Sequence, residues 1–480
     1  MPASDLKKKT AKGLFWGGIG SGTLLLFTVL FGIVLARLLD QSDYGMVAVL
    51  SVFMGIAQTI QDGGFTAGLV NRKEIRHEDY NSVFWFSVGA GLFLYTILFF
   101  SAPLIAAFFK DQSLVGLSRV YFLWFLFGSV GTAHYALLIK ELKVKERTKI
   151  DIASLVISNL IGLALIIKGF GYWGLAIQAV LHSFIGTAMR WYYSSWRPAF
   201  SFSITPLKEM LPFSIKVVLT GIVYQINATM LTSLLGRFNT KHEVGDYDQG
   251  RKWSTIGSSF VNNIIQGVAQ PVLVDANGDI SRQRNVFRKM LRFTSFISFP
   301  LLLGLAFVAE EFIVILITDK WLASVEIMQL LCVWGAFLPV NTLYTQLIIS
   351  HGKSNIYLLA NIAVGVAQIA TLLYIHPLGI LSMVKAVLCI NFLQLFFLHF
   401  YTNKLIQIKL IDVLKDIMPY LSITCLVLGI SYFISSPFEN IYLKLIVKII
   451  SSVLLYIAIM WKLDSIIFKE CMGYIFKKKE

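Results

Sequence analysis

The chain alternates between long apolar runs and short polar segments. The apolar runs are about 20 residues long, the length at which a helix spans the roughly 30 Å of hydrocarbon in a bilayer, and they recur along the whole sequence. We predict fourteen transmembrane helices from this pattern, at residues 13–39, 45–69, 82–109, 114–139, 150–168, 171–193, 209–235, 252–274, 291–317, 323–349, 355–375, 378–400, 416–436 and 441–461. Strands of a membrane barrel would instead alternate over about 10 residues. The pattern therefore predicts an all-α, polytopic membrane protein.

The two halves of this pattern repeat. The segment Phe109-Lys110-Asp111 precedes an apolar helix and a basic turn, and has a counterpart about 208 residues later in Thr318-Asp319-Lys320-Trp321. Likewise, Pro377-Leu378-Gly379 echoes Tyr172-Trp173-Gly174. Six spans with the same orientation in each half predict two six-helix lobes in parallel repeat. The predicted domains are an N-terminal lobe, a C-terminal lobe, and two additional apolar helices with a basic cytoplasmic tail, at residues 1–205, 206–405 and 406–480.

Composition and charge agree with a membrane protein. Hydrophobic residues make up 56 % of the chain and charged residues 14 %, which is too little charge for the water-facing surface of a soluble protein. The net charge of +15 does not indicate nucleic acid, because the basic residues lie in short loops. They are richer in every second loop, which predicts that both termini lie in the cytoplasm. The four cysteines form no CxxC pair, so we expect neither a disulfide framework nor a metal site, and no cofactor.

Two predicted spans carry continuous polar stripes. At 100° per residue, one face of the span at 209–235 holds Lys216, Thr220, Tyr224 and Asn227. One face of the span at 252–274 holds Arg251, Thr255, Ser259, Asn262, Gln266 and Gln270. Polar groups are costly in hydrocarbon, so the stripes predict the wall of a path for a polar, anionic substrate. Hydrogen bonding between helices is the alternative explanation.

The spans at 13–39 and 45–69 correspond to these two in the repeat and hold further candidates. Gln58 lies on a polar face of the second span, and Arg37 lies near the end of the first. Both are predicted to contact substrate. Asp62 is the clearest acidic residue within a predicted span, which makes it a candidate for coupling to a proton or sodium ion. A salt bridge or a helix-end contact is the alternative for Asp62.

Several short motifs together resemble those of the Wzx-type (WzxC-like) flippases of lipopolysaccharide and exopolysaccharide, in the multidrug/oligosaccharidyl-lipid/polysaccharide exporter superfamily. The motifs are Lys12-Gly13-Leu14-Phe15-Trp16, Leu35-Ala36-Arg37-Leu38-Leu39, Asp43-Tyr44-Gly45, Asp62-Gly63-Gly64-Phe65, Asn81-Ser82-Val83-Phe84-Trp85, Ala102-Pro103-Leu104-Ile105-Ala106-Ala107-Phe108-Phe109, Leu235-Gly236-Arg237-Phe238, Gly245-Asp246-Tyr247, Phe299-Pro300-Leu301 and Asp319-Lys320-Trp321. They cover most of residues 10–335.

The resemblance implies two six-helix lobes around a cationic cavity, working by alternating access in the bacterial cytoplasmic (inner) membrane. The implied substrate is an undecaprenyl-diphosphate-linked oligosaccharide for O-antigen, capsule or exopolysaccharide. The implied partners are this lipid-linked oligosaccharide, membrane lipids, and the polymerase or glycosyltransferases of the same pathway, with no nucleic acid. The chain departs from some relatives in one respect, because cavity arginines in the first two spans are not evident apart from Arg37.

Two other functions compete with a flippase. A cation-coupled multidrug exporter of the same superfamily would want an acidic cavity, whereas the stripes carry Lys216 and Arg251. A membrane polysaccharide polymerase would want a large outer loop with catalytic residues, and no predicted outer loop exceeds roughly 20 residues. The sequence also lacks a Walker motif. We therefore expect a transporter without enzymatic activity.

Overall fold

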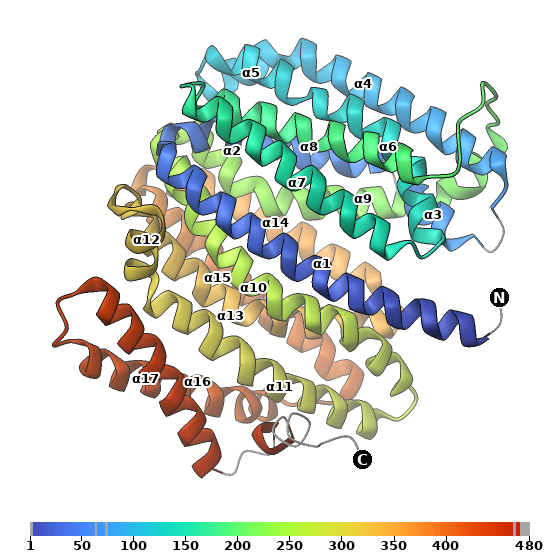
Figure 1. Ribbon diagram of the computed structural model, residues 1–480. Coiled ribbons are helices and arrows are strands. Elements are labelled where there is room, and N and C mark those ends of the chain that lie inside the picture. The colour runs from blue at the N-terminus through green and yellow to red at the C-terminus, as the bar shows by residue number, and fades with distance from the viewer. Residues whose placement is uncertain (1–2, 63–64, 73–74, 464–466, 471–480) are drawn as a thin grey trace. The chain divides into compact units, whose positions relative to one another are not determined.

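The chain forms two compact helical units in this computed structural model (Figure 1). The structure describes residues 3–62, 65–72, 75–463 and 467–470. The side chains at positions 3–15, 17–19, 62, 67, 71, 213, 216 and 217 lie outside the described residues. The first unit comprises Met1–Gly245 and the second Asp246–Glu480. All regular structure among the described residues is helical, as the sequence predicted.

The first unit is a bundle of long helices. Its helices are α1 (Ala3–Leu38), α2 (Gln41–Asp62), α3 (Phe65–Asn71), α4 (His77–Phe109), α5 (Ser113–Tyr121), α6 (Leu123–Lys140), α7 (Val144–Ile167), α8 (Tyr172–Tyr193) and α9 (Thr205–Phe238). Helix α7 packs between α1 and α8, α6 packs between α4 and α8, and α9 packs along α2. A buried core that includes Phe84, Leu137 and Trp196 joins α4, α6 and the segment after α8.

The second unit begins within α10 (Lys241–Asp275). It continues with α11 (Ile280–Phe307), α12 (Ala309–Ile317), η1 (Asp319–Trp321), α13 (Ala323–Ser350), α14 (Ser354–Ile375), η2 (His376–Leu378), α15 (Ile380–Ile406), α16 (Leu410–Ser435) and α17 (Ile441–Lys462). Helix α13 packs between α11 and α15, and α16 packs on α11 and α17. Asp279 caps α11, because its carboxylate accepts the backbone N–H groups of Ser281 (2.9 Å) and Arg282 (3.0 Å).

Twelve helical segments among the described residues are long and apolar enough to span a membrane. The predicted count of fourteen is therefore not confirmed. The two predicted spans outside the twelve are α8 and α10, which form helices of 22 and 35 residues. Polar side chains interrupt both, such as His182 and Arg190 in α8 and Arg251 and Gln266 in α10.

The predicted repeat is visible in the backbone. Left-handed conformations occur at Lys110 (φ 57°), Leu142 (φ 56°) and Gly171 (φ 49°) in the first half. Thr318 (φ 84°), Gly352 (φ 70°) and Gly379 (φ 84°) hold matching positions between helices in the second half. Such conformations are rare for residues other than glycine, so their recurrence after α4, α6 and α7 and after α12, α13 and α14 marks equivalent helix ends. The parallel repeat is confirmed, whereas the predicted domain boundaries at residues 205 and 405 stay predictions.

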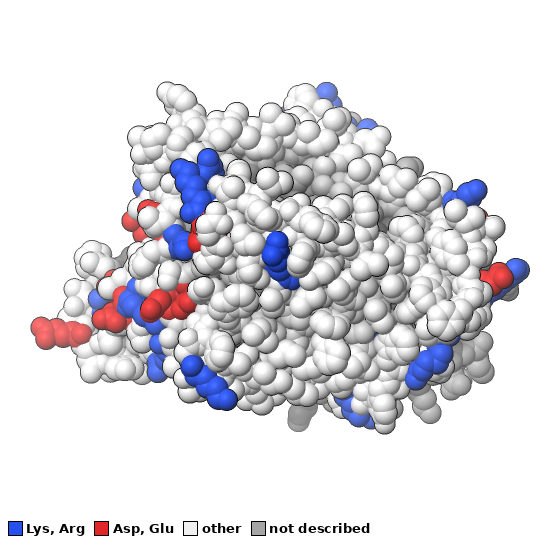
Figure 2. All heavy atoms as spheres, turned by 90° about the horizontal axis from the view of Figure 1, so that it is seen from above, with Lys and Arg blue, Asp and Glu red and all other residues white. Residues whose placement is uncertain are grey.

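The outer surfaces of the helices suit a lipid environment. Large apolar side chains such as Phe93, Phe100 and Leu104 of α4 are mostly exposed. The face drawn in Figure 2 shows charged side chains only as scattered groups on a broad uncharged surface. Large apolar side chains exposed in this number are not tolerated in water. It is expected for a multi-pass membrane protein.

Candidate functional site

A polar cavity of about 310 Å³ lies inside the first unit, a size within the usual range for small-molecule sites. Helices α2, α6 and α8 form most of its wall, with single residues from α3 and α7. Its lining includes the polar or aromatic side chains of Gln58, Gln61, Trp124, Tyr135, His182 and Arg190. A polar cavity among membrane-spanning helices can hold a polar group that lipid would exclude.

Helix α8 is polar because one of its faces lines this cavity. His182, Ser183, Gly186 and Arg190 all line the cavity, and at 100° per residue they fall within one arc of the helix. Of the residues predicted from sequence to contact substrate, Gln58 lines this cavity and its side chain is exposed. The sequence analysis predicted this segment as an apolar span and assigned no residue of it to a site, although His182 and Arg190 are polar positions within it.

Small residues keep the cavity open. A methyl group added at Gly128 would lie 3.4 Å from both Gln61 Nε2 and Ser183 Oγ. A methyl group at Gly186 would lie 3.8 Å from Ser154 Oγ. These are ordinary van der Waals distances, so alanine fits at both positions, whereas a longer side chain would project into the cavity. Glycine at these positions preserves volume rather than backbone conformation.

The polar groups around the cavity also tie the helices together. Gln61 Nε2 donates a hydrogen bond to the carbonyl of Phe125 (2.9 Å), and Ser183 Oγ donates to the carbonyl of Trp124 (3.1 Å). Both bonds reach α6, one from α2 and one from α8. Gln61 Oε1 is buried and has no hydrogen-bond partner among the described residues. A buried acceptor left open in this way is a candidate partner for a donor group of a ligand.

The α1–α2 and α9–α10 turns contact each other reciprocally within the first unit. A methyl group at Gly45 would overlap the backbone carbonyl of Lys241, and one at Gly245 would overlap the backbone carbonyl of Gln41. The two contacts are equivalent by the repeat, because Gln41 corresponds to Lys241 and Gly45 to Gly245, each 200 positions later. Such a pair of contacts is the signature of a local two-fold axis. The two helix ends can approach this closely only because both glycines lack a side chain.

The same turns are capped in the same way. The backbone N–H of Asp40 donates to the Asp43 carboxylate (3.2 Å), and that of Thr240 donates to the Glu243 carboxylate (2.9 Å). Both follow the capping-box pattern, in which an acidic side chain at the third helical position reaches back to the cap. Asp43 also accepts the backbone N–H of Tyr172 (3.0 Å) at the start of α8. These contacts hold the two turns in matching conformations.

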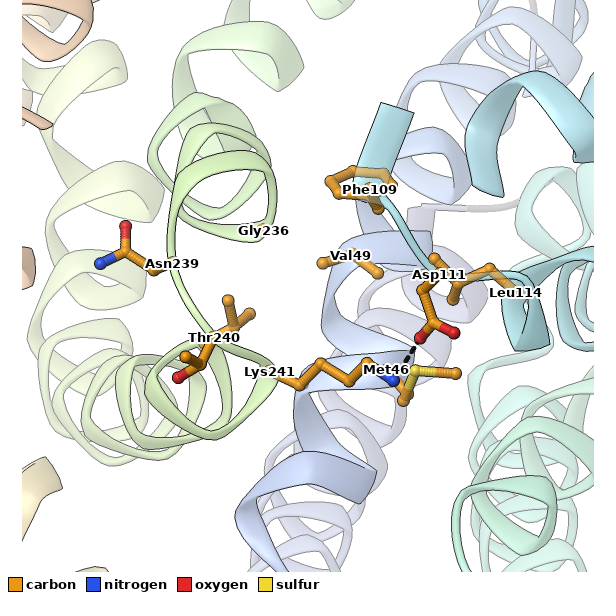
Figure 3. A pocket seen from close by; sticks show the side chains of 11 residues that line it. Met46, Val49, Phe109, Asp111, Leu114, Gly236, Asn239, Thr240 and Lys241 are labelled. Atoms are coloured by element: carbon orange, nitrogen blue, oxygen red, sulfur yellow. Dashed lines mark ion pairs between the residues drawn. The ribbon is translucent and has the colours of Figure 1, made fainter. Parts of the chain in front are cut away.

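The contact between the α1–α2 and α9–α10 turns is named the reciprocal closure. An ion pair between Lys241 and Asp111 joins it to the α4–α5 corner, beside a cavity of about 300 Å³ (Figure 3). Figure 3 shows Lys241 extending from the start of α10 toward Asp111 below Phe109. Burial acts to raise the pKa of Asp111, but hydrogen bonds from Lys241 and Ser113 outweigh it and lower the pKa below its ordinary value of 3.8. The carboxylate therefore stays ionised at neutral pH and holds Lys241.

The remaining predicted residues of the first unit lie on three helices. Arg37 near the end of α1 is exposed, and on α9 Thr220 and Tyr224 are exposed and Asn227 is half-buried. The side chains of Lys216 and Asp62 lie outside the described residues. The contacts proposed for all of these side chains stay predictions.

On α10, two predicted residues of the stripe have protein partners in the second unit. Arg251 Nη2 pairs with Asp248 Oδ1 (3.0 Å), and Asn262 Oδ1 accepts a hydrogen bond from Thr342 Oγ1 of α13 (2.6 Å). Ser259 is half-buried and Gln266 is exposed. The Asn262 contact is of the interhelical kind that the sequence left open as an alternative.

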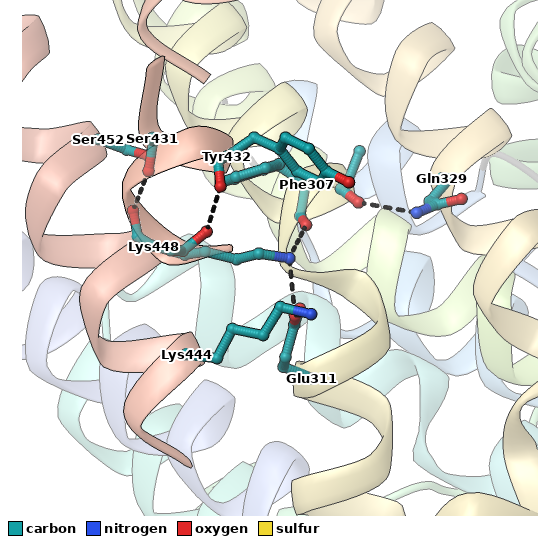
Figure 4. A network of polar contacts seen from close by, with 10 residues as sticks. Phe307, Glu311, Gln329, Ser431, Tyr432, Lys444, Lys448 and Ser452 are labelled. Carbon is teal, nitrogen blue, oxygen red and sulfur yellow. Dashed lines mark hydrogen bonds and ion pairs between the residues drawn. The ribbon is translucent and has the colours of Figure 1, made fainter. Parts of the chain in front are cut away.

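Charged groups of the second unit pair with one another and hold the last two helices. Lys448 of α17 is 6 % exposed and lies 2.7 Å from Glu311 of α12, which is 2 % exposed and also lies 3.5 Å from Lys444 (Figure 4). Lys448 Nζ also donates to the carbonyl of Phe307 (3.2 Å).

A second contact holds α16 on α11, where Asp416 pairs with Arg288 and Arg292, each at 2.6 Å. The two additional apolar helices predicted at residues 406–480, α16 and α17, are thus held to the rest of the second unit by ion pairs at two places.

The motif at 81–85 has a structural role. Asn81 accepts the backbone N–H of Ala199 (2.9 Å) and donates to Ser201, and Trp85 Nε1 donates to the carbonyl of Ala199 (2.8 Å). These bonds fix the segment between α8 and α9 against α4. The motif therefore positions α9 within the first unit.

Comparison with known proteins identifies relatives in polysaccharide biosynthesis. The chain is 26 % identical over 358 residues to the lipopolysaccharide biosynthesis protein WzxC of Escherichia coli, with 73 % of this chain and 72 % of that protein covered. It is 25 % identical over 366 residues to the teichuronic acid biosynthesis protein TuaB of Bacillus subtilis, with 73 % of each covered.

Solved structures share the fold. The lipid II flippase MurJ in an inward closed conformation matches with a TM-score of 0.75 at 13 % identity, over 96 % of this chain and 99 % of that one. An inward-facing multidrug MATE transporter of the MOP superfamily matches with a TM-score of 0.65 at 16 % identity, over 80 % of this chain and 94 % of that one.

The family of polysaccharide biosynthesis proteins matches residues 34–326. This range contains most of the motifs from which the resemblance to Wzx-type flippases was predicted, and that prediction is confirmed. It also contains the polar cavity and the reciprocal closure described above. This multi-pass membrane chain therefore belongs to the polysaccharide biosynthesis protein family.

Proposed function

We propose that the chain is a flippase that moves a lipid-linked oligosaccharide across the bacterial cytoplasmic membrane by alternating access, for the synthesis of a surface polysaccharide. The observation that carries the proposal is the polar cavity of about 310 Å³ among apolar helices. A glycan headgroup must leave water to cross the bilayer, and polar side chains such as Gln58 and His182 can replace its hydration. In this proposal the lipid tail stays in the bilayer, outside the cavity.

The reciprocal closure supports alternating access. We infer that the contact of Gly45 and Gly245 with the opposite backbones closes one end of the path and opens when substrate leaves. The ion pair of Lys241 with Asp111 would then break in the same step. In this proposal this end lies outside and both termini lie in the cytoplasm, the orientation predicted from the charges of the other loops. Labelling of single cysteines at Arg284 and Phe238 tests the orientation, because Arg284→Cys must react only from the cytoplasm and Phe238→Cys only from outside.

Lys216 and the stripes on α9 and α10 remain part of the proposal. Lys216 would meet the anionic headgroup as it enters, while Asn262 and Gln266 would engage sugar hydroxyls. Asp62 would bind a coupling ion. The chain would act without enzymatic activity, supplying the transport step between the glycosyltransferases and the polymerase of its pathway.

Complementation tests the proposal. A strain that lacks its own flippase and therefore makes no surface polysaccharide is given the wild-type gene, a Gly128→Leu variant or a Gly89→Leu variant. We expect the wild type and Gly89→Leu to restore the polysaccharide, because nothing lies within 4 Å of a methyl group at Gly89 of α4. Gly128→Leu would fill the cavity and lose most export at an equal membrane level. Drug resistance conferred without any polysaccharide would favour the multidrug exporter instead.

A further inference from the structure

The segment between α8 and α9 exposes aromatic side chains at the end of the first unit where α4 begins. Residues 194–204 belong to neither helix. Phe200 is 99 % exposed and Phe202 is 58 % exposed, and the exposed Ile204 continues the series. A serine separates each of these apolar residues from the next. Apolar side chains that a protein exposes side by side mark a contact surface.

The protein holds this segment in place. The side-chain amide of Asn81, which is buried, accepts the backbone N–H of Ala199 (2.9 Å) and donates to Ser201 Oγ (3.0 Å). Trp85 Nε1 donates to the carbonyl of Ala199, and the Trp85 ring lies 5.6 Å from the ring of Phe200 between centroids. The aromatic side chains are therefore exposed by a fixed backbone and not by a loose loop.

The backbone of the segment needs a polar environment. The N–H and C=O groups of Phe200 and Phe202 have no hydrogen-bond partner among the described residues. Unpaired backbone groups are excluded from hydrocarbon, whereas the burial of phenyl rings away from water is favourable. Both requirements are met at the boundary between lipid headgroups and acyl chains, where aromatic residues are enriched in membrane proteins.

The charges beside the segment suit the same boundary. Arg197 and Lys208 are exposed, one on each side of the aromatic residues in the sequence. Glu209, the carboxylate that follows Lys208, pairs with Arg72. Exposed basic side chains next to apolar ones can contact the phosphate groups of phospholipids while the apolar ones enter the acyl chains. Charge and hydrophobicity thus favour a lipid surface over water as the environment of this segment.

We propose that residues 195–204 form an interfacial anchor, a segment that lies along the headgroup boundary of one leaflet with Phe200, Phe202 and Ile204 in contact with acyl chains. Phospholipid is the occupant of this surface. Because Asn81 and Trp85 fasten the segment to α4, the anchor sets the depth of the first unit in the bilayer. The inference does not rest on the proposed transport, since it concerns only how the unit is placed in the membrane.

Fluorescence quenching at single labelled cysteines measures this depth. The full-length chain has its four native cysteines replaced by serine, and one new cysteine carries a nitrobenzoxadiazole dye. The protein is placed in nanodiscs whose phosphatidylcholine carries a nitroxide either near the headgroup or near the end of the acyl chain. We expect the dye at Phe200→Cys to be quenched more by the shallow nitroxide, at a depth of about 5–10 Å into the boundary region.

Two other positions of the first unit are matched controls. Phe93 of α4 is also exposed and lies about 12 Å farther along the helix than Trp85, so Phe93→Cys should be quenched more by the deep nitroxide. Glu141 lies in the α6–α7 turn at the same end as α3, because its neighbour Lys140 donates to the carbonyl of Val70 (3.0 Å). Glu141→Cys should be quenched weakly by both nitroxides and strongly by iodide in the water.

The alternation within the segment gives a finer test. Ser203 is less exposed than its neighbours, so the shallow nitroxide should quench Ser203→Cys less than Phe202→Cys. Both phenylalanines are exposed, so that their substitution leaves no internal cavity. Thermal unfolding of each labelled variant shows that the fold is retained.

Three results would overturn the anchor. Iodide quenching at Phe200→Cys as strong as that at Glu141→Cys would place the segment in water. Quenching by the deep nitroxide as strong as that at Phe93→Cys would place it within the hydrocarbon. Protection of Phe200→Cys from iodide and from both nitroxides would make the surface a contact with another protein.

Discussion

Two regions of the molecule place charged side chains among membrane-spanning helices, and they do so in opposite ways. In the second unit, Glu311 faces Lys448 at 2.7 Å with both residues almost fully buried. In the first unit, Arg147 and Arg190 lie against the ring of Tyr135, next to an open polar cavity. The first arrangement joins opposite charges where no ligand can enter. The second places two cations against an aromatic ring at the wall of a cavity, with the carboxylate of Asp151 close enough to act on both.

The difference separates a structural use of charge from the functional use that we propose for the cavity. A buried ion pair satisfies its own charges, and removing one partner leaves the other uncompensated. An aromatic ring holds a cation by a weaker attraction than a buried ion pair does, about 0.5–1 kcal/mol at an exposed site. An ionisable residue within a membrane helix is therefore not enough to mark a transport site. The partner that holds the residue in place decides between the two roles.

The largest effect is expected at the buried pair. Lys448→Met leaves Glu311 with only Lys444 at 3.5 Å, and breaking a buried pair in this way costs about 3–5 kcal/mol. The thermal unfolding temperature of the purified protein should fall accordingly. The double variant Glu311→Gln, Lys448→Met removes both charges and should recover most of the loss. A single variant as stable as the wild type would show that the pair does not fasten α17.

A smaller effect is expected at the reciprocal closure, where the ion pair of Lys241 with Asp111 breaks each time the closure opens in the proposed transport cycle. In Gly245→Ala the added methyl overlaps the carbonyl of Gln41. Such overpacking costs the closed form about 1–3 kcal/mol. The ratio of open to closed protein should therefore rise by about fivefold or more. Met46 is 3 % exposed beside the contact, so a cysteine at this position should react faster with a membrane-impermeant maleimide. Gly22→Ala, with nothing within 4 Å, is the control. Equal labelling of both variants would argue against a closure.

At the cavity, stability and export should separate. Arg190→Gln loses one contact with the Tyr135 ring, which is worth about 0.5–1 kcal/mol at a partly exposed site. We expect its unfolding temperature to change far less than that of Lys448→Met, while export in the complementation assay falls strongly. A loss of stability as large as that of Lys448→Met would assign the cavity arginine to structure and remove the contrast between the two regions.

The exposed ion pair of the closure should contribute least. Lys241 is 49 % exposed in its side chain, and exposed pairs contribute about 0–1 kcal/mol, so Lys241→Met should scarcely change the unfolding temperature. Because the folded-state pKa of Asp111 is lowered from 3.8, its contribution is present above that value and is lost only as the pH falls through the lowered pKa. Maleimide labelling of Met46→Cys, divided by that of a fully exposed reference cysteine to remove the pH dependence of thiolate formation, should therefore be the same at about pH 5 and pH 8. A higher ratio at pH 5 would contradict this pairing.

More of the fold than of the candidate site could be predicted from the sequence. Hydropathy and repeated motifs around Lys110 and Thr318 were enough for the helices and the parallel repeat, because both are local patterns in sequence. The count of fourteen spans stays unconfirmed at α8 and α10, which form long helices but carry polar residues that line a cavity or pair with neighbours. The meeting of Tyr135, Arg147 and Arg190 could not be predicted, since it depends on how α6, α7 and α8 pack. Gln58 could be predicted from the sequence because it lies on a polar face of its own helix.

Flipping in proteoliposomes shows whether the cavity of the first unit carries the polar headgroup across the membrane, as we propose. A prenyl-diphosphate-linked sugar with a fluorescent label is placed in the bilayer, and dithionite added outside destroys the label in the outer leaflet only. We predict that the wild-type chain and Gly128→Ala make nearly all of the label accessible over time. Vesicles with folded Gly128→Leu should behave like protein-free vesicles, in which about half stays protected. Equal flipping by wild type and Gly128→Leu would show that the headgroup does not pass through this cavity.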